Sequence, residues 1–153
     1  MVTALDDDGV AQLDVLLSEY TSEIRALAYT VLTNVDARLV GATRMVYGNW
    51  NATVVGYSPD GKSRHAVCSV AVYRRWVNLF FFVGPELPDP HGLLKGSGST
   101  VRGVRITNPT DFDDRVAALL DDAVNMWPWK FDSHQPTTTA IVSVSEKRRS
   151  RMT

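Results

Sequence analysis

The stretch "GPELPDPHGLLKGSGSTVRGVRI", residues 84–106, contains the residue types of an anion-binding loop. Lys95 precedes two glycines and two serines, and Arg102 opens the apolar run that follows. Glycines allow a backbone to approach a ligand closely, and the two cations could hold a phosphate or a carboxylate. The order of a nucleotide-binding P-loop is absent, because the lysine precedes the glycines and a predicted strand follows. We therefore predict a long connection between two strands, with Lys95 and Arg102 as candidate ligand-binding residues. The alternative is that Arg102 pairs with an aspartate or with loop carbonyls.

A second candidate binding surface lies near a predicted turn, at Tyr47, Asn49 and Trp50. A tryptophan beside a turn offers a large apolar area at a small entropy cost, and such residues often anchor interactions. The alternative is that the ring packs under the edge of a sheet.

Carboxylates are the weak candidates for a metal site. Asp113, Asp114 and Asp121 lie on a predicted helix, where Asp114 and Asp121 share a face because they are seven residues apart. Residues 6–8 form an acidic triplet. Iron could bind such oxygen ligands, whereas no His-x-x-x-His or Cys-x-x-Cys spacing occurs. The alternatives are a solvated helix face and a helix start. We expect no cofactor, with iron as the alternative.

The sequence offers little support for covalent catalysis. Cys68 lies among apolar residues in a predicted strand, which favours an inert core thiol. Ser97 and Ser99 lack the strand-to-helix elbow of an acyl-transfer serine. We expect no catalytic residue, although an enzyme with a site of dispersed residues remains a third alternative.

Composition sets the class of protein. The chain has 153 residues, enough for one domain, with 44% hydrophobic and 22% charged residues, as in globular proteins. The net charge of −1 gives no general attraction to nucleic acid or anionic membranes, and the single cysteine excludes an intramolecular disulfide. No secretory signal or membrane-length apolar run is present. We expect a cytoplasmic protein that binds neither nucleic acid nor membranes.

Hydrophobic periodicity predicts the elements that position these residues. Apolar spacings of three and four predict one helix over residues 10–32, with the acidic triplet at its start, and a second helix over residues 108–127. Between them, short β-rich segments alternate with turn signals. The segment "WVNLFFFV" is apolar on both faces, which predicts a strand inside the sheet. Residues 141–144 predict an edge strand, and an exposed edge favours a homodimer.

These elements predict an α+β fold: an antiparallel sheet of about five strands with the N-terminal and C-terminal helices packed on one side. The segments "MVYGNW" and "VNLFFFVGPELPDPHGLLKGSGSTVRGVRI", with the helix after them, resemble the YdhG-like family of small intracellular bacterial domains. The resemblance covers about residues 10–126. It implies a fold similar to frataxin in outline, forming a single domain over residues 1–134. Residues 135–153 follow as a tail with a basic end.

The same resemblance bears on function, since one branch of that family has been linked to iron delivery. This chain departs from the family at Asn49 and Trp50, where relatives often carry proline, and its first helix lacks a crowded acidic face. We therefore expect non-catalytic binding of a small ligand or a partner protein. Lys95 and Arg102 would supply charge, and Tyr47 and Trp50 apolar contact. The alternative is an iron-binding, metal-delivery protein.

Overall fold

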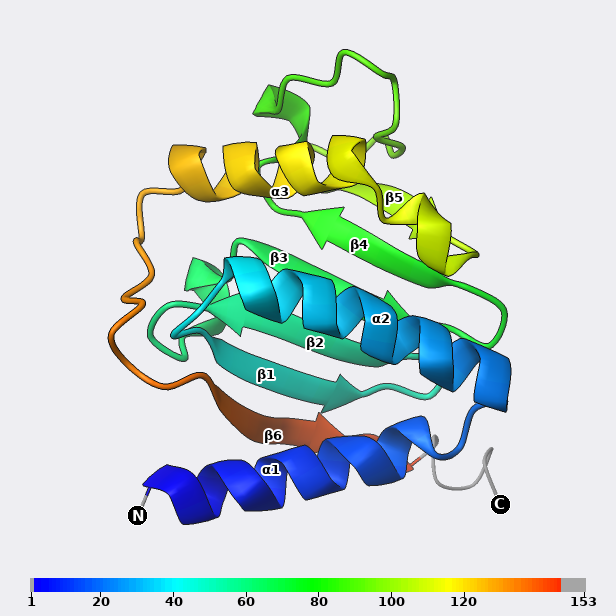
Figure 1. Ribbon diagram of the computed structural model, residues 1–153, viewed down its shortest axis with the longest axis vertical. Helices are drawn as coiled ribbons and strands as arrows, with labels where there is room; N and C mark the ends of the chain where they lie inside the picture. Colours follow the sequence, from blue (N-terminus) through cyan, green and yellow to red (C-terminus); the bar gives the residue numbers. More distant parts are fainter. Residues whose placement is uncertain (1, 147–153) are drawn as a thin grey trace.

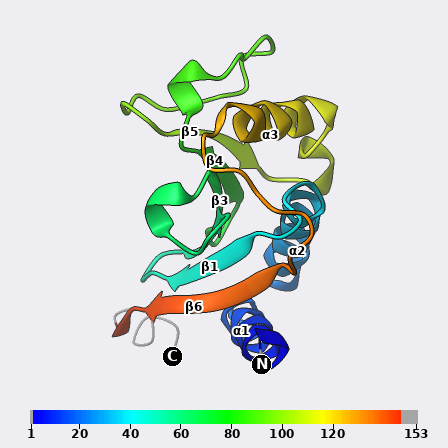
Figure 2. The same ribbon diagram turned by 90° about the vertical axis from the view of Figure 1, so that its left-hand side faces the viewer.

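Three helices cover one face of a six-stranded sheet (Figures 1 and 2). The computed structural model describes the backbone of residues 2–146 and the side chains of residues 8–146. The expected α+β class, with helices on one side of a largely antiparallel sheet, is confirmed, although the sheet has six strands where the sequence predicted about five. No helix in the described part of the chain is both long enough and apolar enough to span a bilayer.

The sheet is a meander extended by one returning strand. Its strand order is β5-β4-β3-β2-β1-β6, and every neighbouring pair is antiparallel except β1 and β6, which are parallel. As predicted, the apolar strand β4 lies inside the sheet, between β3 and β5. The strands are β1 (Thr43–Gly48), β2 (Thr53–Ser58), β3 (Cys68–Val72), β4 (Val77–Phe81), β5 (Arg102–Ile106) and β6 (Thr138–Val144).

The prediction of one N-terminal helix over residues 10–32 is wrong. Two helices, α1 (Val2–Leu17) and α2 (Ser22–Arg38), occupy this region. The Thr21 hydroxyl caps α2 by accepting a hydrogen bond from the Ile24 amide at 3.3 Å. Threonine is a favoured N-cap residue, so this break had a local signal that the continuous apolar stripe obscured.

A tertiary contact fixes the break between these two helices. Tyr20 is 7% exposed, and its hydroxyl donates to the Val72 carbonyl of β3 at 2.9 Å. The start of α1 also differs from expectation, because residues 6–8 lie inside the helix and do not precede it. Asp8 is exposed and accepts a hydrogen bond from Gln12, while the side chains of residues 6 and 7 lie outside the described part.

The core lies between the helices and the inner face of the sheet. One row of residues crosses five strands in register, and its members are at most 6% exposed. Two helices pack against this face: α2, which buries Val31, and α3 (Asp114–Met126), which buries Leu120. The row consists of Val46, Val55, Val70, Leu79 and Val104.

Strand β6 brings the end of the described chain back beside its beginning. It pairs with β1, and α1 packs against it so closely that a Cβ on Gly9 would lie 2.0 Å from the Thr139 carbonyl oxygen. The edge strand expected at residues 141–144 is therefore present and begins earlier, at Thr138. The basic end, residues 147–153, lies outside the described residues.

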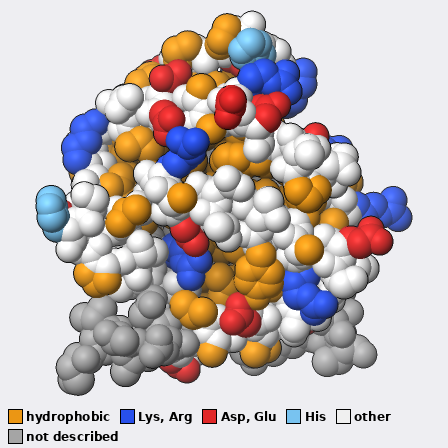
Figure 3. All heavy atoms as spheres, in the orientation of Figure 1, with side chains coloured by type: hydrophobic (Ala, Val, Ile, Leu, Met, Phe, Trp, Pro, Cys, Tyr) orange, Lys and Arg blue, Asp and Glu red, His pale blue; other side chains and the backbone are white. Residues whose placement is uncertain are grey.

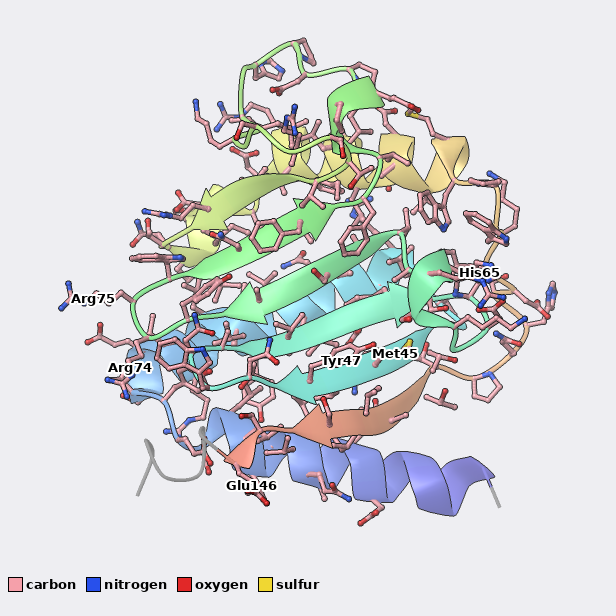
Figure 4. The ribbon with its side chains drawn as sticks, turned by 180° about the vertical axis from the view of Figure 1, so that it is seen from behind. Met45, Tyr47, His65, Arg74, Arg75 and Glu146 are labelled. Carbon is pink, nitrogen blue, oxygen red and sulfur yellow. The ribbon has the colours of Figure 1, made fainter. Side chains whose placement is uncertain are left out.

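No α-helix in the described part of the chain lies over the other face of the sheet, here called the helix-free face, and the 3₁₀ turn Ser63–His65 borders it (Figure 4). Successive side chains of a strand point to opposite faces, so the residues on either side of the buried row face away from the helices. They form two rows across β1 to β5, and Arg105 is their only charged member. Figure 3 shows the contrasting helix-bearing face, where acidic and basic side chains are interspersed. The rows are Met45-Gly56-Ser69-Phe80-Gly103 and Tyr47-Val54-Ala71-Asn78-Arg105.

Candidate functional site

A depression of about 340 Å³ lies on the helix-free face, at the β4–β5 end of the two rows. Asn78 and Phe80 of β4 directly oppose Arg105 and Gly103 of β5. Lys95, from the long loop, pairs with Gly103 on the other side of β5. The sheet register therefore places Arg105 beside Asn78, and it places Lys95 on the far side of β5 from Phe80.

Gly103 gives the depression its floor. A Cβ at this position would lie 2.7 Å and 2.9 Å from two ring carbons of Phe80, a separation that real Cβ atoms do not show. Only a residue without a side chain lets the Phe80 ring lie against β5. The floor is therefore an aromatic ring beside bare backbone.

Arg105 is held in place without using its hydrogen-bonding groups. Its guanidinium carbon lies 3.9 Å from the centroid of the Trp76 ring, a cation–π contact. Among the side chains of residues 8–146, Arg105 forms no ion pair and no hydrogen bond. Its N–H donors lie in the guanidinium plane and stay available for a planar anion.

Lys95 is the predicted site residue that the structure places in this depression. Its backbone and that of Gly103 exchange two hydrogen bonds of 2.9 Å, which fix the base of its side chain. The side chain is exposed, and no carboxylate in the described part of the chain pairs with its ammonium group. A positive charge thus stands uncompensated at the rim of the depression.

Asn78 contributes an unsatisfied acceptor. Its side-chain oxygen Oδ1 is buried and has no hydrogen-bond partner among the described residues. Most buried polar atoms in native proteins are paired, so such an atom calls for an explanation. The sequence analysis missed this residue, although a lone amide inside "WVNLFFFV" was a signal that could have found it.

Arg102, the second predicted cation, does not belong to this depression. Its guanidinium donates to the carbonyl oxygens of Gly98 and Val101, the latter at 2.8 Å. The alternative offered from the sequence, pairing with loop carbonyls, is therefore the observed one. Arg102 closes the loop onto the start of β5, and Gly84 packs against it without room for a Cβ.

The second predicted surface is divided by the structure. Tyr47 and Met45 line a separate depression of about 190 Å³ on the same helix-free face, over β1 to β3 (Figure 4). Asn49 and Trp50 lie in the β1–β2 turn and line neither depression, and Trp50 is 49% exposed. Tyr47 therefore shares a face with Lys95 but not a site.

Two of the three carboxylates proposed for a metal, Asp113 and Asp121, are engaged in other contacts. Asp113 caps the helix by accepting from the Arg115 amide at 3.0 Å, and the Arg115 guanidinium lowers the pKa of its carboxyl. Asp121 forms an ion pair of 3.0 Å with Arg38. Asp114 lines a cleft of about 240 Å³ between α3 and residues 88–93. Within residues 8–146, no three His, Cys, Asp or Glu side chains are grouped closely enough to hold a metal ion.

Cys68 is an interior residue. It is fully buried on β3, and burial raises the pKa of its thiol. A thiol that resists ionisation is a poor nucleophile, which agrees with its expected role in packing.

Comparison with known proteins gave no match to any family model, curated protein or solved structure. The resemblance to the YdhG-like family stays a prediction.

Proposed function

We propose that this chain is a non-catalytic binding domain that takes up a small organic anion in the β4–β5 depression of its helix-free sheet face. One observation carries the proposal: Arg105 and Lys95 border the same depression, and no described carboxylate neutralises either of them. The sequence had suggested Lys95 for this role, and the structure adds Arg105.

The chemistry of the depression defines the ligand class. The guanidinium group of Arg105 can donate two parallel hydrogen bonds to a carboxylate or a phosphate, and Lys95 adds a point charge. The two outward rows contain no Asp or Glu that would repel an anion. Phe80 offers a flat apolar surface, and a volume of about 340 Å³ suits a small molecule. The ligand is thus an acid with a flat apolar part.

Two simple probes, benzoate and phenyl phosphate, test the proposal by titration into ¹⁵N-labelled protein at low salt. We expect both to shift the amide resonances of Asn78, Phe80, Lys95, Gly103 and Arg105, and the Nε–H resonance of Arg105. The probe that binds more tightly identifies the preferred acidic group.

Charge variants separate a specific site from general attraction. Arg105→Gln and Lys95→Gln should each weaken binding about tenfold or more, because hydrogen bonds to charged groups contribute about 1.5–3 kcal/mol. Arg64→Gln and Lys62→Gln remove equal charges from exposed side chains outside the depression and should change little. The proposal is wrong if neither probe shifts these resonances, or if the control variants weaken binding equally.

A further inference from the structure

Resting on the proposed function, we infer that the ligand carries a neutral hydrogen-bond donor, a hydroxyl or an amide N–H, next to its acidic group. A 2-hydroxy acid and an N-acylated amino acid have this arrangement. The inference comes from the place of Asn78 in the depression, which the binding of an anion alone does not explain.

The unpaired oxygen of Asn78 is the first argument. Oδ1 is buried without a partner among the described residues, and Asn78 lines the depression. A buried acceptor without a donor is costly, whereas an apolar side chain at this position of the strand would carry no such cost. The Asn78 side chain as a whole is only half-buried, so a turn of its amide brings the oxygen to the depression, where a ligand that donates a hydrogen bond removes the penalty.

The sheet register is the second argument. Asn78 and Arg105 directly oppose each other on β4 and β5, and such pairs have Cβ atoms roughly 4.5–5.5 Å apart. The Trp76 contact holds the Arg105 guanidinium in place from one side. An acidic group on this guanidinium therefore places the adjacent carbon of the ligand, and any substituent on it, within reach of the amide oxygen.

Charge and polarity exclude the other substituents. An ammonium group would be repelled by Arg105, which directly opposes the amide, and by Lys95 at the rim of the depression. A keto or ether oxygen would set its lone pairs against those of Oδ1 and leave both acceptors unpaired. A neutral hydroxyl or amide N–H satisfies the oxygen without adding charge.

Three probes that share a phenyl ring and a carboxylate test this inference. Phenylacetate has no donor, mandelate has a hydroxyl on the adjacent carbon, and phenylglyoxylate has a keto oxygen there. With the wild-type chain, we expect calorimetry or NMR titration to show that mandelate binds about tenfold more tightly than phenylacetate, and phenylglyoxylate no better than phenylacetate.

Variants of Asn78 assign the preference to its oxygen. Asn78→Leu should bind mandelate and phenylacetate equally, and Asn78→Asp should lose all three probes because its charge repels them. Asn125→Leu, the same change at an exposed position of α3, should retain the preference. An NMR spectrum of each variant checks that it is folded, and the three-probe comparison on the wild-type chain needs no variant.

The outcomes separate the two proposals. Equal binding of mandelate and phenylacetate, weakened by Arg105→Gln, overturns the donor inference and leaves the proposed function standing. Tighter binding of phenylglyoxylate, or a mandelate preference that survives in Asn78→Leu, also overturns the inference. Absence of binding by all three probes overturns both proposals.

Discussion

Replacing Asn78 by leucine should make the ligand-free protein more stable. The substitution removes a buried acceptor that has no partner among the described residues and puts a side chain of similar size in its place. Core substitutions of polar residues usually destabilise when they break a hydrogen bond, but this oxygen has none to break. A gain in stability is expected because the unpaired oxygen costs free energy in the ligand-free protein and is paired only when a ligand binds.

The magnitude follows from the state of that oxygen. A buried polar group left unpaired costs about 1–3 kcal/mol. Asparagine is also disfavoured in strands, on a scale that spans about 1 kcal/mol. Because Asn78 is half-buried and part of its amide stays hydrated, we expect the lower part of this range, a gain of about 1–2 kcal/mol. For a chain of this length, each kcal/mol raises Tm by about 2–4 °C.

Urea denaturation of the wild-type chain and the variant, followed by circular dichroism, measures the change in the free energy of unfolding. Asn125→Leu is the control, since an exposed substitution should stay within about 0.5 kcal/mol. If Asn78→Leu instead loses about 1 kcal/mol or more, the oxygen is paired in solution, and it then places no demand on a ligand.

Three further predictions concern the support of the site and the fold. Gly103→Ala places a Cβ 2.7 Å from the facing aromatic ring; we expect a loss of about 1–3 kcal/mol in urea denaturation and loss of benzoate binding, and unchanged values would refute the tight floor. Tyr57 is fully buried and its hydroxyl donates to Asp36 at 2.7 Å, so Tyr57→Phe should cost about 1.5–3 kcal/mol, and a loss under about 0.5 kcal/mol would contradict this role. The hydrogen bond with His65 lowers the pKa of Asp60 to about 2, below its value of about 4 in an unfolded chain. The resulting stabilisation is present above about pH 4 and is lost as the pH falls toward 2. Asp60→Asn should therefore flatten the dependence of unfolding free energy on pH in this window, and an unchanged slope argues against the contact.

The strands could be predicted because their signals are local. Short β-rich segments separated by turn signals predict the strands of the meander, and the two-sided apolar pattern places β4 inside the sheet. The break before α2 could not be read from periodicity, because the apolar stripe continues through Tyr20. The Tyr20 side chain is buried, and its hydroxyl donates a hydrogen bond to β3. This is a tertiary contact, so the spacing of apolar residues along the helices does not reveal it.

The site was predictable only in part, for the same reason. Lys95 stands out in a glycine-rich loop, but nothing local distinguishes it from Arg102, which the loop carbonyls bind. Arg105 and Asn78 become partners through the register of β4 and β5. Register depends on pairing across the sheet, so a residue-by-residue scan does not reveal which side chains meet.

The most direct test of an anion site on the helix-free sheet face is a crystal structure of the protein grown with saturating mandelate. We expect the carboxylate on the Arg105 guanidinium, the ring against Phe80, and the hydroxyl roughly 2.5–3.0 Å from Asn78 Oδ1. Mandelate bound elsewhere, for example in the cleft beside α3, with no ligand between Arg105 and Lys95, would contradict the account.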